Sequence, residues 1–559
     1  MAVTKDYFLT GTIDGDQNYP EMVRLKNGNL VLVWQDWPLD PDGYGVYASV
    51  LTPGLGTIRA DIRVAQETRG SQRYGQISAL RDGGFVVGWD SNGPARTSGI
   101  QDGWWDGYLR IFNADGSART AEIQISPQQN KDNIFRDVAT LSDGSILAVV
   151  ANRELGSTYD LIAHRYSASG QRIGSPVMLV SDTTQGGIAV GSSFLVPRVE
   201  IATAANGYVM VWTGKVDGQS SIYGRAIHFQ AFGNNGAPVG AERIVFFDKT
   251  ESFLDQYNPR ITALSDGRYA VSWSRQTDGD DSDQIDTALR VLDSRGNALT
   301  GVIRVNTGNI AGEQNVADVI DLGGGKLLVT FYAYNAGESS STRDYFDLMG
   351  RVFTTGGQAV TGAMKLGQYA YEDMQGGNTV VRADGAIVLV REAMVFDDID
   401  SDIVGTVITQ LLPIQNGTGG ANWMTGTVLR DRLNGLAGND TLAGGNGNDW
   451  LGGGDGNDSL SGGQGFDSLI GGRGNDLLKG GTSADLFVFR ADFDRDVVLD
   501  FQNNVDTIQL RDFGISSFAQ ARAHATQQGA DVVFNLGDGD VLTIRGATIG
   551  QLADDMIFG

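Results

Sequence analysis

Acidic residues recur every nine positions near the end of this chain, in a pattern that could hold a metal ion. They are Asp440, Asp449, Asp458, Asp467, Asp476 and Asp485, and they lie within six nonapeptides that run from residue 435 to residue 488. Glycines fill most of the positions before each aspartate. Calcium is a hard cation that takes six to eight oxygen ligands, more than one nonapeptide can supply. The spacing therefore predicts that nonapeptides stacked on one another share each ion.

Each nonapeptide is predicted to supply one turn and one short strand. Its first six residues are rich in glycine, which permits positive φ angles and close backbone approach. Its last three residues carry one large apolar side chain, two positions after the aspartate: Leu442, Leu451, Leu460, Leu469, Leu478 and Phe487. The pattern G-G-x-G-x-D-x-U-x is typical of a parallel β-roll, and two nonapeptides complete one coil. Residues 18 apart then stack, so Asp440 lies over Asp458. A flexible glycine-rich linker is the alternative, but a linker has no need for so strict a register.

This segment resembles the RTX, or haemolysin-type calcium-binding, family. The resemblance implies that the second, fourth and sixth positions of one repeat join the first, third and sixth positions of the repeat two later. Four inter-turn sites follow, and the implied ligands are Leu436, Gly438, Asp440, Gly445, Gly447, Asp449, Gly453, Gly454, Asp455, Gly456, Asp458, Gly462, Gly463, Gln464, Gly465, Asp467, Gly471, Arg473, Asp476, Gly480, Thr482 and Asp485.

The repeat pattern weakens at both ends of the array. Residues 426–434 keep Asp431 in register but lose the glycines, and residues 417–425 place Asn422 at the aspartate position. These are expected to be degenerate coils with one or two weaker sites, which brings the expected total to about four to six calcium ions. In the last repeat Ser483 replaces the fourth-position glycine, which puts the geometry of that turn in question.

The resemblance continues to the end of the chain. Residues 496–513 are similar to the segment that caps the roll in serralysin-type proteases, and residues 537–558 resemble the final hairpin and tail of type I secretion substrates. The tail carries two acidic residues and then apolar ones, here Asp554, Asp555, Met556, Ile557 and Phe558. The resemblance implies a type I secretion exporter as partner during export, and an extracellular location, secreted or associated with the cell surface. The same residues could also form an ordinary capping strand, and both readings can hold together.

Composition agrees with an exported, metal-dependent protein. The 559 residues carry a net charge of −25 and contain no cysteine, so calcium rather than disulfides would stabilise the fold outside the cell. The negative charge argues against nucleic acid and anionic membranes as partners. The first residues lack the apolar core of a signal peptide, and no run of 18 apolar residues occurs. We therefore expect export without an N-terminal signal, and no membrane insertion.

The first 412 residues show a longer repeat. Two β-rich runs joined by an Asn-Gly, Asp-Gly or Gly-Gly turn recur at intervals of 55 to 63 residues, with the turns at Asn27, Asp82, Asp143, Asn206, Asp266, Gly324 and Asp384. Such turns are strong hairpin signals. Four short strands per repeat indicate propeller blades, although a tandem array of small β-sandwiches is the main rival. The expected fold is all-β: a seven-bladed β-propeller over residues 1–412, closed by the N-terminal strand near residues 7–12, then the β-roll over 417–488 and a β-rich cap over 489–559.

Loops of the propeller offer candidate ligand sites. The loop of residues 90–107 carries Trp104 and Trp105 beside two aspartates. Aromatic faces beside carboxylates suit carbohydrate rings, and packing within the loop itself is the alternative. Residues 277–286 and 396–402 are acidic enough for calcium but lack the EF-hand spacing, so solvated loops are the favoured reading.

A basic side chain recurs on the third strand of five blades: Arg110, His164, Arg225, Arg290 and Arg351. Such a ring could line an anion channel. Because the feature repeats in most blades, packing against aromatics or pairing with acids between blades is favoured.

No catalytic residue can be nominated. The chain has three histidines, no H-E-x-x-H motif, no nucleophile elbow and no P-loop. Two function classes stay open. The leading one is a secreted calcium-binding protein whose propeller is a binding, adhesion or surface module for a glycan or another cell-surface partner. The alternative is a polysaccharide-degrading enzyme, a glycoside hydrolase or lyase, in which paired carboxylates would do the chemistry.

Overall fold

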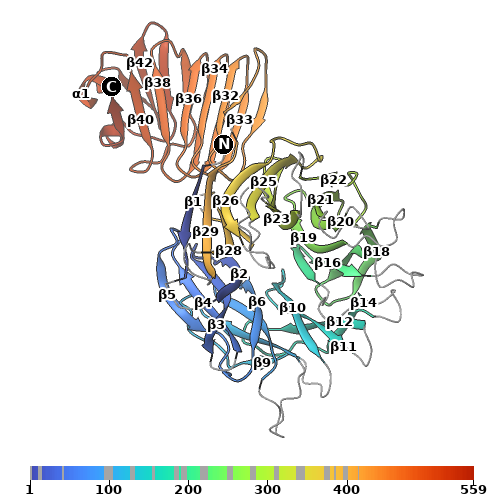
Figure 1. The fold of residues 1–559 in the computed structure, drawn as a ribbon. Helices are drawn as coiled ribbons and strands as arrows, with labels where there is room; N and C mark the ends of the chain where they lie inside the picture. Colours follow the sequence, from blue (N-terminus) through green and yellow to red (C-terminus); the bar gives the residue numbers. More distant parts are fainter. Residues whose placement is uncertain are drawn as a thin grey trace.

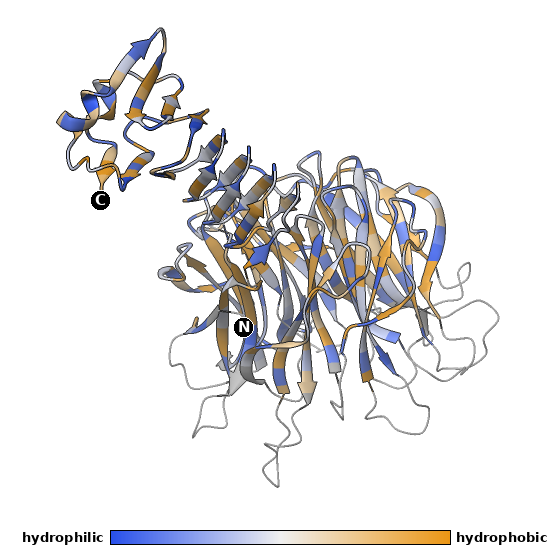
Figure 2. Cartoon of the chain, turned by 90° about the horizontal axis from the view of Figure 1, so that it is seen from above, coloured by the Kyte–Doolittle hydropathy of each residue, from blue (hydrophilic) through white to orange (hydrophobic). Residues whose placement is uncertain are grey.

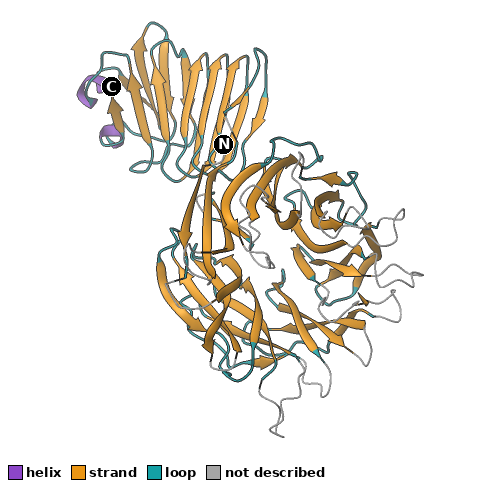
Figure 3. Cartoon of the chain, in the orientation of Figure 1, coloured by secondary structure: helices purple, strands orange, loops and turns teal. Residues whose placement is uncertain are grey.

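A computed structural model gives the fold of the protein. It describes residues 3–10, 16–40, 43–93, 105–125, 132–153, 158–181, 188–189, 198–214, 225–247, 256–276, 285–306, 314–334, 346–370, 378–382, 385–394, 401–412 and 414–559. Strands make up almost all of its regular structure (Figure 3), and the described helices are the short α1 (Phe518–Arg522) and the 3₁₀ turn η1 (Gln551–Ala553). Neither is long and apolar enough to cross a bilayer.

The described strands before residue 411 form seven four-stranded blades arranged in a ring (Figure 1). Blade one contains β2 (Asp16–Arg24), β3 (Leu30–Asp40), β4 (Gly43–Leu51) and β5 (Thr57–Arg63), and blade two contains β6 (Gln72–Ala79), β7 (Phe85–Ser91), β8 (Asp106–Phe112) and β9 (Ile123–Gln124). Blade three contains β10 (Asn133–Thr140), β11 (Ile146–Arg153), β12 (Thr158–Tyr166) and β13 (Val177–Val180). Blade four contains β15 (Val199–Ala204), β16 (Gly207–Gly214), β17 (Ala226–Gly233) and β18 (Pro238–Phe246). Blades five to seven contain β19 (Gln256–Ala263), β20 (Tyr269–Gln276), β21 (Ile285–Leu292), β22 (Ile303–Arg304); β23 (Gln314–Gly323), β24 (Lys326–Tyr334), β25 (Phe346–Thr354), β26 (Met364–Ala370); and β27 (Thr379–Val381), β28 (Ile387–Met394), β29 (Ser401–Gln410), β1 (Val3–Phe8).

Two features depart from seven separate antiparallel sheets. One parallel pairing, Asn133 of β10 with Asp106 of β8, joins blades two and three into a single sheet. The two-residue strand β14 (Ile188–Ala189) pairs with β12. The predicted fold class, a seven-bladed propeller followed by a β-roll, is confirmed.

The core of the ring lies between blades. The cluster that joins blades one and two, for example, packs Val33 and Val46 against Phe85, Val87 and Trp89. Five aromatic residues at equivalent places within the second strands of five blades are all buried: Trp34, Trp89, Trp212, Trp273 and Phe331. At the ring closure β1 pairs with β29, and β28 shares a core with blade one. No blade could bury this surface alone, which excludes independent sandwiches.

The first strands of neighbouring blades contact one another and line the centre of the ring. One side chain per blade occupies an equivalent place on these strands: Glu21, Gln76, Asp137, Glu200, Arg260, Asp318 and Asn378. In blades one, two, three, five and six a β-bulge ends at this residue.

Several of these side chains connect adjacent blades. Oδ2 of Asp137 accepts a hydrogen bond from Ile201 N at 2.9 Å. Nη1 of Arg260 lies 2.5 Å from Oε1 of Glu200. The side chain of Asn378 exchanges two hydrogen bonds of 2.8 Å with the backbone of Met22. The ring is therefore closed by polar contacts at its centre as well as by apolar contacts between blades.

Two mainly parallel sheets follow the propeller and form the roll and its cap. The first contains β30 (Gln415–Asn416), β32 (Arg432–Ala437), β34 (Trp450–Asp455), β36 (Ser468–Arg473), β38 (Leu486–Arg490), β40 (Thr507–Arg511) and β44 (Met556–Phe558). The second contains β31 (Trp423–Thr425), β33 (Thr441–Asn446), β35 (Ser459–Gln464), β37 (Leu477–Thr482), β39 (Arg495–Val498), β43 (Asp540–Ile544), β42 (Asp531–Gly537) and β41 (Ala525–Gln528).

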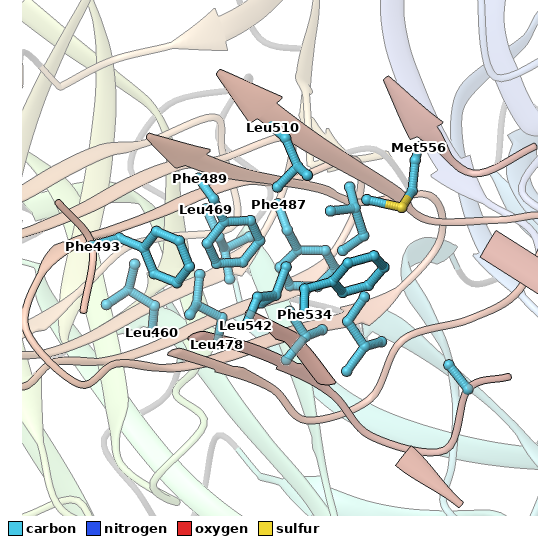
Figure 4. Close-up of a cluster of buried hydrophobic side chains, with 14 of the residues drawn as sticks. Leu460, Leu469, Leu478, Phe487, Phe489, Phe493, Leu510, Phe534, Leu542 and Met556 are labelled. Atoms are coloured by element: carbon cyan, nitrogen blue, oxygen red, sulfur yellow. The ribbon is translucent and has the colours of Figure 1, made fainter. Parts of the chain in front are cut away.

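The stacking of residues 18 apart is confirmed. Leu442 of β33 pairs with Leu460 of β35, and Leu451 of β34 with Leu469 of β36. The leucines form one buried column that continues into the cap through Phe487, Phe534 and Leu542 (Figure 4). Roll and cap therefore share a hydrophobic core and extend together away from the ring (Figure 2).

The degenerate coil 426–434 attaches the roll to blades six and seven. Val428 N donates to the carbonyl of Leu322 at 2.7 Å, and Lys326 Nζ donates to the carbonyl of Thr425 at 2.9 Å. Leu429 is buried in the core of these two blades. A β-carbon at Gly385 would overlap the carbonyl oxygen of Val428, so the backbones are in close contact there.

Candidate metal centre

The turns of the roll have a repeating backbone shape. At the second and fourth positions of the repeats φ is positive, for example 120° at Gly463 and 123° at Gly465. Two non-glycine residues adopt the same region, Leu436 at 79° and Ser483 at 81°. The replacement of glycine by Ser483 therefore leaves the last turn in the shape of the others, at the cost of some backbone strain.

The aspartates form two ladders along the roll. In each step, the backbone N–H of one aspartate donates to Oδ1 of the aspartate 18 residues later. The distance is 2.7 Å from Asp440 to Asp458 and 2.8 Å from Asp449 to Asp467. The next steps measure 2.7 Å to Asp476 and 2.9 Å to Asp485. One oxygen of each carboxylate is thus held against the preceding coil.

The other carboxylate oxygen, Oδ2, has no hydrogen-bond partner within the described structure. This holds for every aspartate of the six repeats: Asp440, Asp449, Asp458, Asp467, Asp476 and Asp485. Each of these residues is at most 2% exposed. A buried polar oxygen without a partner costs roughly 1–3 kcal/mol, and more when it is charged. Such oxygens need either a proton or a cation.

Backbone oxygens converge on the same places. A β-carbon built on Gly453 would overlap both Oδ2 of Asp458 and the carbonyl oxygen of Gly471. The same pairing of carboxylate and carbonyl recurs beside Gly435, Gly444 and Gly462. Four such cradles therefore occur within the six repeats, one for each site that the spacing predicts, and a fifth lies beside Gly426 of the preceding degenerate coil.

Carbonyls at the second and fourth positions of the repeats face the next coil. Those of Gly445 and Gly447 point at Gly463 and Gly465 of the repeat two later. The described residues contain no group of three or more acidic or histidine side chains that could hold a metal by themselves. Two carboxylates with several carbonyls are, however, the all-oxygen set that a calcium ion accepts. The residues present fit calcium.

Burial of these carboxyls shifts their acidity. It raises the pKa of Asp449 from 3.8 to about 8, with smaller upward contributions from the neighbouring Asp467 and Asp431. Burial likewise raises the pKa of Asp467 to about 6 and the pKa values of Asp476 and Asp485 to about 7. Without a cation, these groups therefore take up protons between about pH 6 and pH 8.

The two degenerate coils differ from the repeats. Oδ2 of Asp431 accepts hydrogen bonds from Thr427 N at 2.6 Å and from its Oγ1 at 2.8 Å. Oδ1 of Asn422 accepts from Thr418 N at 2.6 Å. Both side chains are satisfied by protein groups, so these coils lack the free oxygen that marks the six repeats.

One residue with the same signature was missed by the sequence reasoning. Asp496, in the cap, is 1% exposed and its Oδ2 also has no partner among the described residues. A signal was present, because the apolar Val498 follows it by two positions. The positions just before Asp496 contain no glycine, so the sequence did not indicate a repeat turn there.

The expected propeller sites are only partly visible. Trp104 and most of the two acidic loops lie outside the described residues. Trp105 is half-buried, its ring lies 3.5 Å from the guanidinium carbon of Arg73, and its backbone N–H donates to Asp132.

The basic side chains on the third strands serve the packing of the blades. Nη1 of Arg110 donates to Val64 O at 2.9 Å, and Nη1 of Arg351 donates to Val305 O at 2.8 Å, in each case to the preceding blade. The placement of Arg225 in this set was wrong. Arg225 precedes β17, and Gln230 occupies the equivalent position in that strand.

Comparisons with known proteins bear on the two parts separately. The family model described as the RTX calcium-binding nonapeptide repeat matches residues 416–451, 425–460 and 452–487. No curated protein matches the chain.

Several solved structures resemble the propeller at low identity. A protein of unknown function from Dyadobacter fermentans is 11% identical, with 72% of this chain and 98% of that chain covered and a TM-score of 0.42. An ulvan lyase of the polysaccharide lyase family PL25 is 9% identical, with 72% and 95% covered and a TM-score of 0.46. An α-L-arabinanase from Penicillium chrysogenum is 10% identical, with 60% and 92% covered and a TM-score of 0.40.

The repeats, their aspartate ladders and the family match agree on one part of the chain. Residues 416–487 are RTX calcium-binding nonapeptide repeats folded as a parallel β-roll, and such repeats indicate a secreted protein.

Proposed function

We propose that this chain is an exported calcium-binding protein in which the ions complete a C-terminal roll and the propeller binds a partner outside the cell. The division into a propeller (1–412), a roll (417–488) and a capping and secretion-signal region (489–559) is part of this proposal. So is the recognition of the last region by a type I exporter.

One observation carries the calcium part of the proposal. In four places a buried Oδ2 without a partner shares a cradle with a carbonyl oxygen from the next coil. Asp440, Asp449, Asp458 and Asp467 supply those oxygens, and the aspartate 18 residues later stacks on each. When bound, calcium would supply the positive charge that these oxygens lack. The chain's own groups fix the spacing of the coils.

Blocking one cradle should remove one ion. Gly453→Ala places a methyl group against Asp458 Oδ2 and Gly471 O, at a residue whose φ is not positive, so the backbone tolerates alanine. We expect isothermal titration calorimetry of the full chain to show one ion fewer than wild type. At ten times Kd, each ion contributes about 1.4 kcal/mol of stability. Gly420→Ala, where a β-carbon meets no atom, is the matched control and should bind as wild type. Equal stoichiometry in both variants would contradict the assignment.

The pH dependence of the roll should change sign with calcium. Without calcium, the folded pKa values of about 6 to 8 lie above the ordinary 3.8. Stability from these groups is therefore complete below about pH 4 and is lost as the pH rises through 6 to 8. With calcium, the ionised carboxylates are favoured, so stabilisation grows over the same window.

Hydrogen exchange of full-length protein, read on peptides from 441–487 and corrected for the intrinsic rate, measures both trends. Protection should fall from pH 5 to pH 8.5 in a calcium-free buffer and rise when calcium is present. Propeller peptides serve as the internal control for calcium, because the change of sign with calcium should be confined to the roll. Protection of the roll that is independent of pH without calcium would refute the assigned pKa shifts.

For the propeller, a glycan or another cell-surface partner is the proposed ligand. The support is the clustering of aromatics and carboxylates in the loop that carries Trp104 and Trp105, of which Trp105 lies under Arg73. A glycan array in calcium should show binding that Trp104→Ala and Trp105→Ala each weaken at least tenfold. Trp423→Ala removes a tryptophan that is 81% exposed on the roll and is the control. Binding that survives both loop variants would move the site elsewhere.

The centre of the ring supports the enzymatic alternative. Burial raises the pKa of Glu21 to about 7, partly offset by Arg260, and raises the pKa of Asp318 to about 6. Carboxyls that titrate near neutral pH can act as general acids or bases. The same set of central side chains includes Glu200, which pairs with Arg260.

If the carboxyls at the centre of the ring are catalytic, we expect shortened products from any glycan that the protein binds. Glu21→Gln should then lower kcat at least a hundredfold while leaving glycan affinity intact. Gln76→Glu, at the equivalent place in blade two, is the comparison variant. Binding without cleavage by wild-type protein would rule the enzymatic alternative out for that glycan.

A further inference from the structure

The turn before Asp496 has the shape of a repeat turn without its glycines. In the repeats, φ is positive four and two residues before the aspartate, as at Gly472 and Gly474 before Asp476. Four and two residues before Asp496 stand Asp492, with φ of 71°, and Asp494, with φ of 62°. Left-handed backbone costs a non-glycine residue roughly 1 kcal/mol or more. The segment 491–499 therefore adopts the repeat conformation against its local preference.

The interval to the preceding aspartate is also irregular. Asp496 follows Asp485 by 11 residues instead of nine, so the period is lost as well as the glycines. The apolar position is nevertheless kept, because Val498 is fully buried in the roll core.

The same hydrogen-bond ladder reaches this turn. Asp476 N donates to Oδ1 of Asp496 at 2.9 Å, and the carbonyl of Asp476 accepts from Val497 N at 2.9 Å. Strand β39 pairs in parallel with β37, as the repeats pair with one another. The coil that contains Asp496 is therefore stacked on the coil that contains Asp476.

The turn is held in place by a carboxylate from the cap. The two oxygens of Asp540, at the start of β43, accept hydrogen bonds from Asp492 N and Asp494 N, both at 3.0 Å. These contacts fix the two left-handed residues. They also bring a further negative charge to the end of the ladder.

Oδ2 of Asp496 is left in the same condition as its counterparts in the repeats. The residue is 1% exposed, and no hydrogen-bond donor within the described structure reaches this oxygen. Burial, with smaller contributions from the nearby Asp476, Asp494 and Asp540, raises the pKa of Asp496 to about 9. Each of these neighbours is acidic, so the surroundings call for positive charge.

We propose that Asp476 and Asp496 bind a further divalent cation, between the turn of residues 471–476 and the turn of residues 491–496, beyond the nonapeptide repeats. The donors are the buried carboxylate oxygens of Asp476 and Asp496, and oxygen donors favour calcium over softer metals. This inference rests on the proposed calcium function of the roll. It adds a site at the junction of the roll and the cap, where the cation would join the stacked coils to the segment closed by Asp540.

The test is the number of ions bound by the full chain. Asp496→Asn keeps an Oδ1 that can accept from Asp476 N but replaces the free oxygen with an amide nitrogen. Equilibrium dialysis against calcium should show one ion fewer than wild type. Asp512→Asn removes an exposed carboxylate of the same cap and should leave the number unchanged. An unchanged number in Asp496→Asn, with Asp512→Asn also unchanged, overturns the proposal and leaves a proton as the occupant.

A second measurement uses the wild-type chain and does not depend on the folding of any variant. Crystals grown in calcium should show an anomalous difference peak about 2.3–2.6 Å from Oδ2 of Asp496. Peaks in the repeats with none at Asp496 would refute the added site alone. Peaks at neither place would refute the proposed calcium function itself, so the two failures are distinguishable.

Discussion

Buried carboxylate oxygens without partners are the constraint on which the C-terminal roll of this structure depends. Each aspartate of the roll uses one oxygen to hold the coil before it and leaves the other in a space with almost no solvent access. Such an arrangement is unfavourable for the protein alone, because desolvation of a charge is costly. The backbone supports it only because glycine at the turn allows carbonyl oxygens to approach the same spot. The glycines of the sequence, the backbone shape of the turns and the preference of calcium for oxygen ligands therefore depend on one another.

The propeller satisfies its polar groups in a different way. Its central side chains, such as Asp137, Arg260 and Asn378, connect the first strand of one blade to the next through ordinary hydrogen bonds and ion pairs. Its apolar residues pack between blades, so each blade contributes half of two cores. The two parts of the chain therefore differ in what stabilises them: the propeller is completed by its own side chains, whereas the roll is completed by the proposed calcium ions.

Much of this could be predicted from the sequence, because both parts are periodic. A strict nine-residue spacing of Asp and Leu leaves little freedom in the roll, and Asp440 to Asp485 lie in the ladders where the spacing puts them. The recurrent hairpin turns likewise predicted seven blades. Prediction failed where period and residue type were both lost. Asp496 was missed because Asp492 and Asp494 adopt positive φ angles, which are usually taken by glycine. Arg225 was misplaced because strand register across a hairpin is set by pairing, which spacing alone does not give. The central ring was not predicted, since β-bulges re-aim its side chains.

The coil that joins the propeller to the roll has a consequence for the order in which the coils of the roll form. Asp431 is already satisfied by Thr427, and Leu429 is anchored in the core of blades six and seven. The roll therefore starts from a foundation that needs no metal. Because each later coil contacts only its neighbours, we expect the coils of the roll to become ordered one after another, from the propeller toward the chain end. If the proposed calcium ions fill the gaps between coils, an ion bound in one gap orders the coil that forms the next gap, and we therefore expect the roll to order over a narrow range of calcium concentration.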